Sequence, residues 1–161
     1  MSRYIFTPKG YEALSKIIKK NELLLNKSTK VKSEAGAGQD DWHDEQFQRA
    51  MIEEEMWGKR VRDIKEVLSQ AEIIEPKEQN EVVDLGTGVV LKFENGSISK
   101  YILEGFAVEA LDNRLSIHSP LGEAILGAKK GEKRTFQVEK KSKSVIVVEI
   151  LLPSKAEEIF K

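Results

Sequence analysis

The sequence predicts an α+β protein in which an N-terminal antiparallel helical hairpin precedes a small antiparallel sheet with one short helix. Apolar residues recur at helical spacing over two long stretches before Pro76, and short apolar runs separated by glycines follow from Val82. Charged residues make up 33% of the 161 residues, which favours a coiled coil with much exposed surface. We therefore expect a hairpin domain over residues 1–75, a linker over 76–81 and a second domain over 82–161.

The first helix is expected to begin at Pro8, because Thr7 can cap it and proline suits the first helical position, whose N–H has no partner. Its apolar residues lie three and four apart and form one stripe: Leu14, Ile17, Ile18, Leu24, Leu25 and Val31. The pattern ends within 34–38, where two glycines favour a bend.

The second helix is predicted from about Asp44 to Ala71, with a seam of alternating four- and three-residue spacing. Its members are Ala50, Glu54, Trp57, Val61, Ile64, Leu68 and Ala71, and Glu54 is the polar exception. Two helices of about 40 Å, joined by a short turn, should fold back into an antiparallel coiled coil. Such a rod is too thin for a three-dimensional core and would end in a tip at Gly36–Asp44.

The second half contains short runs rich in Val, Ile, Leu and Phe that predict strands: Val82–Val83, Gly88–Phe93, Ser99–Leu103, Leu115–Ile117, Thr135–Val138 and Val145–Leu152. The nearly continuous apolar run at Val145–Leu152 predicts the central strand. Asn95 and Gly96 indicate a hairpin turn, and Pro120–Gly127 is expected to hold the short helix. Ser154–Lys161 is expected to be a tail with a helical turn.

Composition excludes several classes of function. There are no cysteines and only two histidines, which argues against disulfide scaffolds, zinc sites and thiol nucleophiles. The formal net charge of −1 argues against nucleic-acid binding by bulk charge. No apolar run is long enough to span a membrane, and the first residues lack a signal-peptide pattern, so we expect a soluble cytoplasmic protein.

The predicted tip carries four acids within six residues: Asp40, Asp41, Asp44 and Glu45. In one interpretation they only cap the second helix and complement its dipole. In the other, their mutual repulsion is relieved by a divalent cation such as Mg²⁺, which takes one or two protein carboxylates and completes its shell from a partner site. Trp42 either packs back on the hairpin or contacts a partner.

Basic residues gather on the two predicted helices of the hairpin: Lys16, Lys19, Lys20, Lys27, Lys30, Lys32, Lys59, Arg60, Arg62 and Lys65. Such residues usually form no more than a solvated helix face. Because the first helix carries few acids after Glu12, a basic side that contacts RNA or an acidic protein surface is the alternative hypothesis.

Three motifs carry a family resemblance over nearly the whole length. Thr7, Gly10 and Leu14 match an N-terminal pattern, and the stretch 61–74 matches a closing pattern of the second helix. The most specific match runs over 115–127, with Ser-Pro-Leu-Gly at 119–122, and continues to Gly131-Glu132. On these residues the chain resembles the GreA/GreB family of bacterial transcript cleavage factors.

The resemblance implies a coiled-coil N-terminal domain and an FKBP-like C-terminal domain that binds bacterial RNA polymerase. Ser119, Pro120, Leu121 and Gly122 would belong to the polymerase-binding segment. The coiled coil would enter the secondary channel, where two tip acids help to hold a second Mg²⁺ that activates water for hydrolysis of backtracked RNA. The free protein would be a monomer without a cofactor and not an enzyme by itself.

Asp41 and Asp44 keep the acid-x-x-acid spacing of the family and are the predicted catalytic and metal-binding residues, with Asp40 and Glu45 as substitutes. The predicted guides of the RNA 3′ end are Lys19, Lys20, Lys27, Lys30, Arg60 and Arg62.

The tip departs from the family pattern, because Asp44 replaces a Glu and Glu45 an Asn. A second hypothesis is therefore a secondary-channel regulator that modulates or inhibits polymerase without cleavage. A third, a prolyl isomerase or chaperone, rests on the FKBP-like fold alone.

Overall fold

The computed structural model describes residues 4–36, 41–106 and 113–160, which divide between two compact units. One unit is Glu12–Gln70, and the other joins the residues up to Tyr11 with those from Ala71 onward. The predicted boundary at residue 75 differs from this division because β1 (Tyr4–Phe6) pairs in parallel with β2 (Ala71–Ile73). Neither strand was expected from the sequence, since three residues are too few to show a period.

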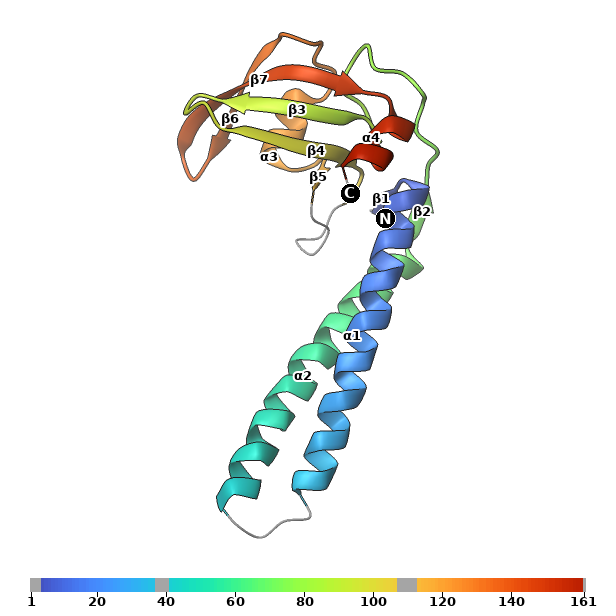
Figure 1. Ribbon diagram of the computed structural model, residues 1–161, viewed down its shortest axis with the longest axis vertical. Coiled ribbons are helices and arrows are strands. Elements are labelled where there is room, and N and C mark those ends of the chain that lie inside the picture. The colour runs from blue at the N-terminus through green and yellow to red at the C-terminus, as the bar shows by residue number, and fades with distance from the viewer. Residues whose placement is uncertain (1–3, 37–40, 107–112, 161) are drawn as a thin grey trace. The chain divides into compact units, whose positions relative to one another are not determined.

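The first unit is a helical hairpin built from α1 (Pro8–Ala35) and α2 (Asp41–Ser69), which run side by side in Figure 1. Cross-helix contacts follow antiparallel order: Glu22 with Lys65, Leu25 with Gly58, and Lys32 with Glu54. The predicted hairpin is therefore confirmed. Its second helix begins at Asp41 rather than near Asp44, and Ala71 lies in β2 rather than in the seam.

The hairpin seam is narrow and partly polar. On α1 the seam contains four buried residues spaced seven apart: Leu14, Asn21, Ser28 and Ala35. Every predicted seam residue of α2 is buried or half-buried. Because polar residues in a coiled-coil seam fix the register at the expense of stability, Asn21 and Ser28 favour one alignment of the helices.

The second unit contains a five-stranded sheet in the order β5-β4-β3-β7-β6 (Figure 1). Its strands are β3 (Gly88–Phe93), β4 (Ile98–Glu104), β5 (Arg114–Ser116), β6 (Lys133–Val138) and β7 (Lys141–Leu151). The expectation of an antiparallel sheet was wrong in one respect, because β5 pairs with β4 in parallel.

Two further expectations for the sheet need correction. The middle strand is β3, although β7 does lie between two neighbours. Val82–Val83 forms no strand; instead Val83 is buried, its N–H donates to the Ala128 carbonyl, and its carbonyl accepts from the Gly127 N–H. The predicted turn is confirmed, with Gly96 at φ 83° and the Asn95 side chain accepting from the Ser97 N–H at 2.9 Å.

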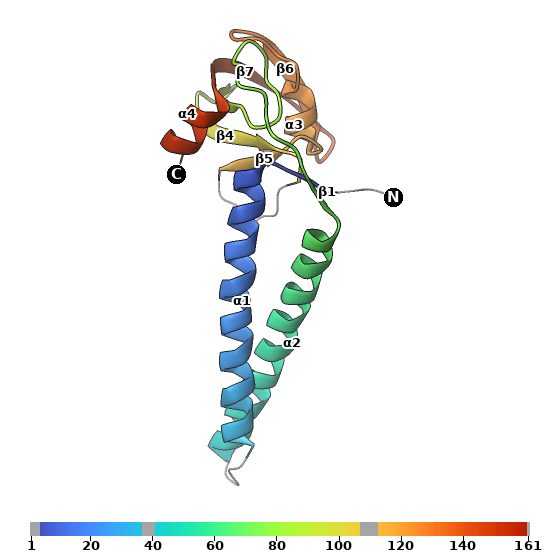
Figure 2. The ribbon, with the colours of Figure 1, turned by 90° about the vertical axis from the view of Figure 1, so that its right-hand side faces the viewer.

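Two short helices cover opposite faces of the sheet, as Figure 2 shows. One face packs against α3 (Pro120–Ile125) around a core that includes Val89, Leu91, Leu103, Ile125, Phe136, Val145 and Val147. The other face meets α4 (Pro153–Ile159), where a Cβ at Gly88 would lie 2.6 Å from that of Ala156. Within the described ranges, no helix is long and apolar enough to cross a membrane.

Candidate functional site

The predicted catalytic acids fall at the start of α2. Asp41 is the first residue of this helix, and Asp44 and Glu45 are exposed in its first turn. Asp40 lies outside the described residues, as do the side chains of Asp41, Trp42 and His43. Positions 41 and 44 are three apart on one helix and therefore share a face.

The hairpin is closed near this end by an aromatic ring. A Cβ at Gly36 would lie 3.4 Å from the ring of Phe47, so this ring packs against the end of α1. The Gly36 N–H donates to the Lys32 carbonyl at 3.0 Å. The start of α2 thus lies against the end of α1 through the Phe47 ring.

The donor chemistry at the start of α2 suits a shared metal ion. Exposed carboxylates are hard oxygen donors, and Mg²⁺ commonly takes one or two of them with the remaining ligands from water or substrate. Among the residues that the structure describes, no three His, Cys, Asp or Glu side chains gather as a metal site. Asp44 and Glu45 could therefore contribute ligands to a Mg²⁺ only together with groups from elsewhere.

The predicted RNA-guiding lysines of α1 surround one exposed apolar residue. Leu23 is 70% exposed, and Lys19, Lys20, Lys27 and Lys30 lie at helical spacing on either side of it. We call these five residues the Leu23 patch. The sequence reasoning missed Leu23 because it stands in the run 23–25, whose other two members belong to the seam.

The lysines of the Leu23 patch differ from others on the hairpin in their partners. Lys16 pairs with Glu12 at 3.1 Å, Lys32 with Glu54 at 3.2 Å and Lys65 with Glu22 at 3.2 Å. In the described part of the chain, no ion pair involves Lys19, Lys20, Lys27 or Lys30. Their charge is therefore available to an anionic partner.

The two predicted arginines of α2 are more constrained. The guanidinium of Arg60 lies over the Trp57 ring, 5.5 Å from its centroid. That geometry is a cation–π contact, which holds the side chain along the helix. Arg62 folds back so that its Nη1 would lie 3.3 Å from a Cβ at Gly58.

The Ser-Pro-Leu-Gly motif builds the start of α3. The Ser119 hydroxyl accepts from the Gly122 N–H at 3.0 Å and donates to the Ser116 carbonyl at 2.7 Å. Pro120 takes the first helical position, and Leu121 packs against the core. Of these four residues only Pro120 is exposed, and exposed neighbours such as His118 and Glu123 extend the surface beside it.

Replacing Gly122 by Ala is expected to destabilise the second unit by at least about 2 kcal/mol. A Cβ at position 122 would overlap the carbonyl oxygen of Ser116, which is backbone and cannot swing aside. Urea unfolding followed by circular dichroism measures the change. Gly58→Ala is the matched control, because there a Cβ meets the flexible end of Arg62 at 3.3 Å and Leu25 at 3.8 Å, both side chains, and alanine favours a helix. Equal stability of the Gly122→Ala variant and the parent would contradict this reading.

A buried ionic cluster explains why Thr7 and Gly10 occur together in the N-terminal pattern. The Glu104 carboxylate is fully buried and accepts from the Thr7 N–H at 2.5 Å and the Thr7 hydroxyl at 2.9 Å. Arg114 donates to it at 3.1 Å and forms two hydrogen bonds to Glu157, at 2.9 and 2.7 Å. The Thr7 hydroxyl also caps α1 by accepting from the Gly10 N–H at 3.0 Å. A Cβ at Gly10 would overlap the carboxylate, so glycine is required there.

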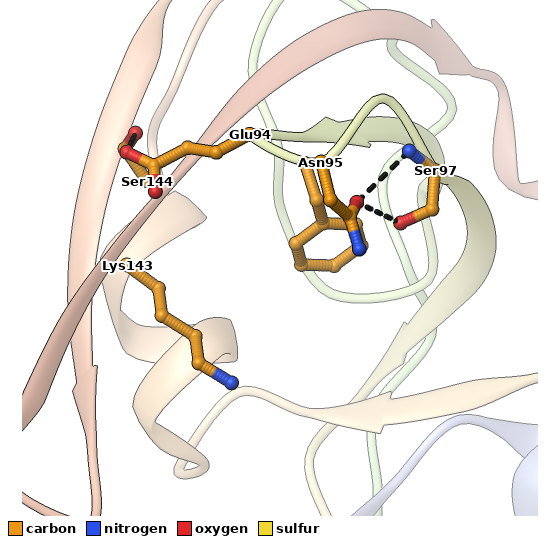
Figure 3. A pocket seen from close by; sticks show the side chains of 6 residues that line it. Glu94, Asn95, Ser97, Lys143 and Ser144 are labelled. Carbon is orange, nitrogen blue, oxygen red and sulfur yellow. Dashed lines mark hydrogen bonds between the residues drawn. The ribbon is translucent and has the colours of Figure 1, made fainter.

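A shallow hollow of about 360 Å³ opens beside the β3–β4 turn, and Figure 3 shows its lining. Glu94, Asn95, Ser97, Lys143 and Ser144 line it together with one aromatic, Phe93. Asn95 is bonded to Ser97, and the Ser144 hydroxyl donates to Glu94. This lining lacks the several aromatics that the isomerase hypothesis would need.

Comparison with known proteins now identifies the class. Residues 78–151 match the family model described as "Transcription elongation factor, GreA/GreB, C-term". The fold and the α3 motif are thus those of a transcription elongation factor. A relative named GreA is 32% identical over 82% of this chain, so the chain belongs to the GreA/GreB family.

Two kinds of relative match the chain. "Transcription elongation factor GreA" of Thermotoga sp. (strain RQ2) is 32% identical over 136 residues, which cover 82% of this chain and 86% of the relative. "Transcription inhibitor protein Gfh1" of Thermus aquaticus is 30% identical over 148 residues, which cover 89% and 94%. A crystal structure of Gfh1 from Thermus thermophilus aligns with a TM-score of 0.46 at 26% identity, covering 92% of this chain and 99% of that one.

Proposed function

We propose that the protein binds bacterial RNA polymerase, inserts its hairpin into the secondary channel and stimulates cleavage of backtracked RNA. The observation that carries this proposal is the hairpin itself, which joins exposed acids in the first turn of α2 to lysines on α1 that form no ion pair with any residue the structure describes. The protein would act as a monomer in the cytoplasm, and the catalytic centre would belong to the polymerase. It contributes carboxylates and does not act as an enzyme alone.

Each part of the chain has one task in this mechanism. The surface around Ser119–Gly122 holds the polymerase, while Asp41 and Asp44, with Asp40 and Glu45 beside them, face the reacting phosphodiester. A Mg²⁺ bound between these acids and the polymerase would supply an activated water for hydrolysis. The carboxylates would orient that water and hold negative charge near the ion, and the two of them whose side chains the structure describes, Asp44 and Glu45, are exposed.

The Leu23 patch would guide the extruded RNA 3′ end. Lys20→Glu combined with Lys27→Glu is expected to lower the cleavage rate about tenfold at low salt, because phosphate contacts by lysine are electrostatic. Lys16→Glu is the control, since Lys16 already pairs with Glu12 and lies outside the patch. The rates are measured on a backtracked complex at two salt concentrations. Equal losses in the patch variant and the control would contradict a guiding role.

A second candidate function is a channel regulator that does not cleave. It is favoured by the match to the inhibitor Gfh1, which extends over 148 residues, and by Asp44, whose side chain is one carbon shorter than glutamate. Such a factor would occupy the channel and slow RNA synthesis.

One experiment separates these functions. A stalled, backtracked elongation complex is incubated with Mg²⁺, with and without the protein, and RNA cleavage and nucleotide addition are both followed. Accelerated cleavage supports the first function. Binding with slowed synthesis and unchanged cleavage supports the second, and absence of binding overturns both.

A further inference from the structure

The sheet face that carries α4 is only half covered. Near Gly88 and Ile102 this face is closed, and Ile102 is buried. Toward the other end of the strands it is open. The open part consists of Val90, Lys92, Ile98, Lys100, Lys133, Ile146 and Val148, and we call it the open face.

Strand register sets apolar and basic residues side by side on the open face. Lys92 of β3 pairs with Ile98 of β4 on one side and with Ile146 of β7 on the other, and Ile146 pairs with Lys133 of β6. Ile98 is 59% exposed, Ile146 40% and Val148 39%. Because directly opposed residues lie about 5 Å apart, these side chains form one continuous surface rather than scattered apolar residues.

The lysines of the open face lack acidic partners. No ion pair in the described part of the chain involves Lys92, Lys100 or Lys133. Two acids lie close by: Glu149 pairs with Val90, and Glu94, which accepts from the Ser144 hydroxyl, lines the same hollow as Lys92 and Lys133. This hollow of about 460 Å³ is open to a side chain of a partner, and its lining combines two lysines and one carboxylate with apolar residues: Lys92, Phe93, Glu94, Lys133, Ser144, Val145 and Ile146. The surface therefore favours a ligand that is both acidic and apolar.

Two other occupants fit the open face less well. Single-stranded RNA is bound on sheets by aromatic stacking, and none of the seven residues is aromatic. A second copy in a symmetric pair would bring the same lysines against each other, and like charges in an interface oppose association.

The chain itself shows what packs on the covered half. There α4, a helix carrying Glu157 and Glu158, lies against Gly88, and Glu157 pairs with Arg114 of the sheet. We propose that the open face docks an acidic amphipathic helix of a partner protein, beside α4. Since α3 and its Ser-Pro-Leu-Gly motif lie on the opposite face, this site is separate from the proposed polymerase-binding segment.

The test uses the full chain with labelled isoleucine methyl groups. The probe is a synthetic helical peptide of about three heptads with a leucine stripe flanked by glutamates, and the matched peptide carries lysines in their place. Saturable methyl shifts at Ile98 and Ile146 are expected with the acidic peptide, while Ile125, the buried last residue of α3, stays unchanged. Lys92→Glu should weaken binding about fivefold, as the loss of one charge contact implies.

Lys77→Glu makes the same change of net charge outside the open face and should leave the affinity within about twofold. The proposal is overturned if the acidic peptide gives no saturable shift up to about 1 mM, a range that includes weak helix docking. It is also overturned if the basic peptide binds equally, if an RNA oligonucleotide produces the same shifts, or if sedimentation shows that this face joins two copies of the chain. None of these readouts involves polymerase, so the result is independent of the proposed function.

Discussion

Replacing both Asp41 and Asp44 by Ala is expected to abolish the stimulation of RNA cleavage, with a loss of at least about 100-fold, while polymerase affinity stays within about twofold. The two positions share one face at the start of α2, and their carboxylates are the proposed ligands of the shared Mg²⁺. Cleavage is measured on a backtracked complex at saturating factor, and affinity is measured by competition with the parent protein.

The control for this double substitution removes the same charge elsewhere on α2. Glu55 and Asp63 are exposed on that helix, and their replacement by Ala should leave cleavage unchanged. Loss of polymerase binding in the Asp41/Asp44 variant would contradict the division of tasks between the hairpin end and the second unit. Asp44→Glu adds one carbon of reach, and it should raise cleavage if the shorter side chain limits the parent protein.

Glu104→Ala is expected to destabilise the second unit by about 3–5 kcal/mol, the usual result of removing one member of a buried ion pair. The change leaves Thr7 N–H without its acceptor and leaves Arg114, only 9% exposed, with Glu157 alone. Urea unfolding monitored by circular dichroism and amide exchange in β4 measures the loss. Tryptophan fluorescence is unsuitable, because Trp42 and Trp57 both belong to the hairpin.

Glu149→Ala is the control for Glu104→Ala. It removes an exposed acid from the same sheet and should change the unfolding free energy by no more than about 0.5 kcal/mol. A Glu104→Ala variant as stable as this control would show that the cluster contributes nothing to the fold.

The stability contributed by Glu104 should depend on pH. Burial raises the pKa of its carboxyl above the ordinary value of 4.5, although the hydrogen bonds from Thr7 and the charge of Arg114 lower it in part. The folded state therefore holds this proton more tightly than the unfolded state. The contribution is complete below the unfolded pKa and is lost as pH rises through the folded pKa. Unfolding free energies of parent and Glu104→Gln from about pH 4 to 8 should show the parent losing stability relative to the variant.

The parts of the fold that follow from local pattern could be predicted from sequence. The helical seam depends on spacing within one helix, and the turn at Asn95-Gly96 depends on two residues that tolerate its backbone angles. The start of α2 was placed three residues late, because Asp41–His43 show no apolar period. The parallel orientation of β5 relative to β4 was also missed, since the pairing of two strands cannot be inferred from either strand alone.

Contacts between distant residues limited the prediction of the sites. The Thr7–Glu104 bonds join residues 97 apart, so the sequence showed Thr7 only as a helix cap. The Ser-Pro-Leu-Gly motif was recognised by resemblance, whereas the need for glycine at 122 became visible only beside the Ser116 carbonyl. The acids and lysines of the hairpin were identified from residue type, but which lysines have acidic partners depends on the facing helix.

The pairing of β1 with β2 has a consequence for the order of folding during synthesis. Residues 12–70 form contacts within one hairpin and can fold as soon as they leave the ribosome. Tyr4–Phe6, in contrast, have no strand partner until β2 has been made, and Thr7 caps α1 locally but lacks its Glu104 acceptor until residue 104 has been made. Closing so long a loop is slow compared with forming a helix. Residues 4–7, although translated before the hairpin, therefore complete their native contacts after it, and a nascent chain arrested before Glu104 should leave this segment open to proteases.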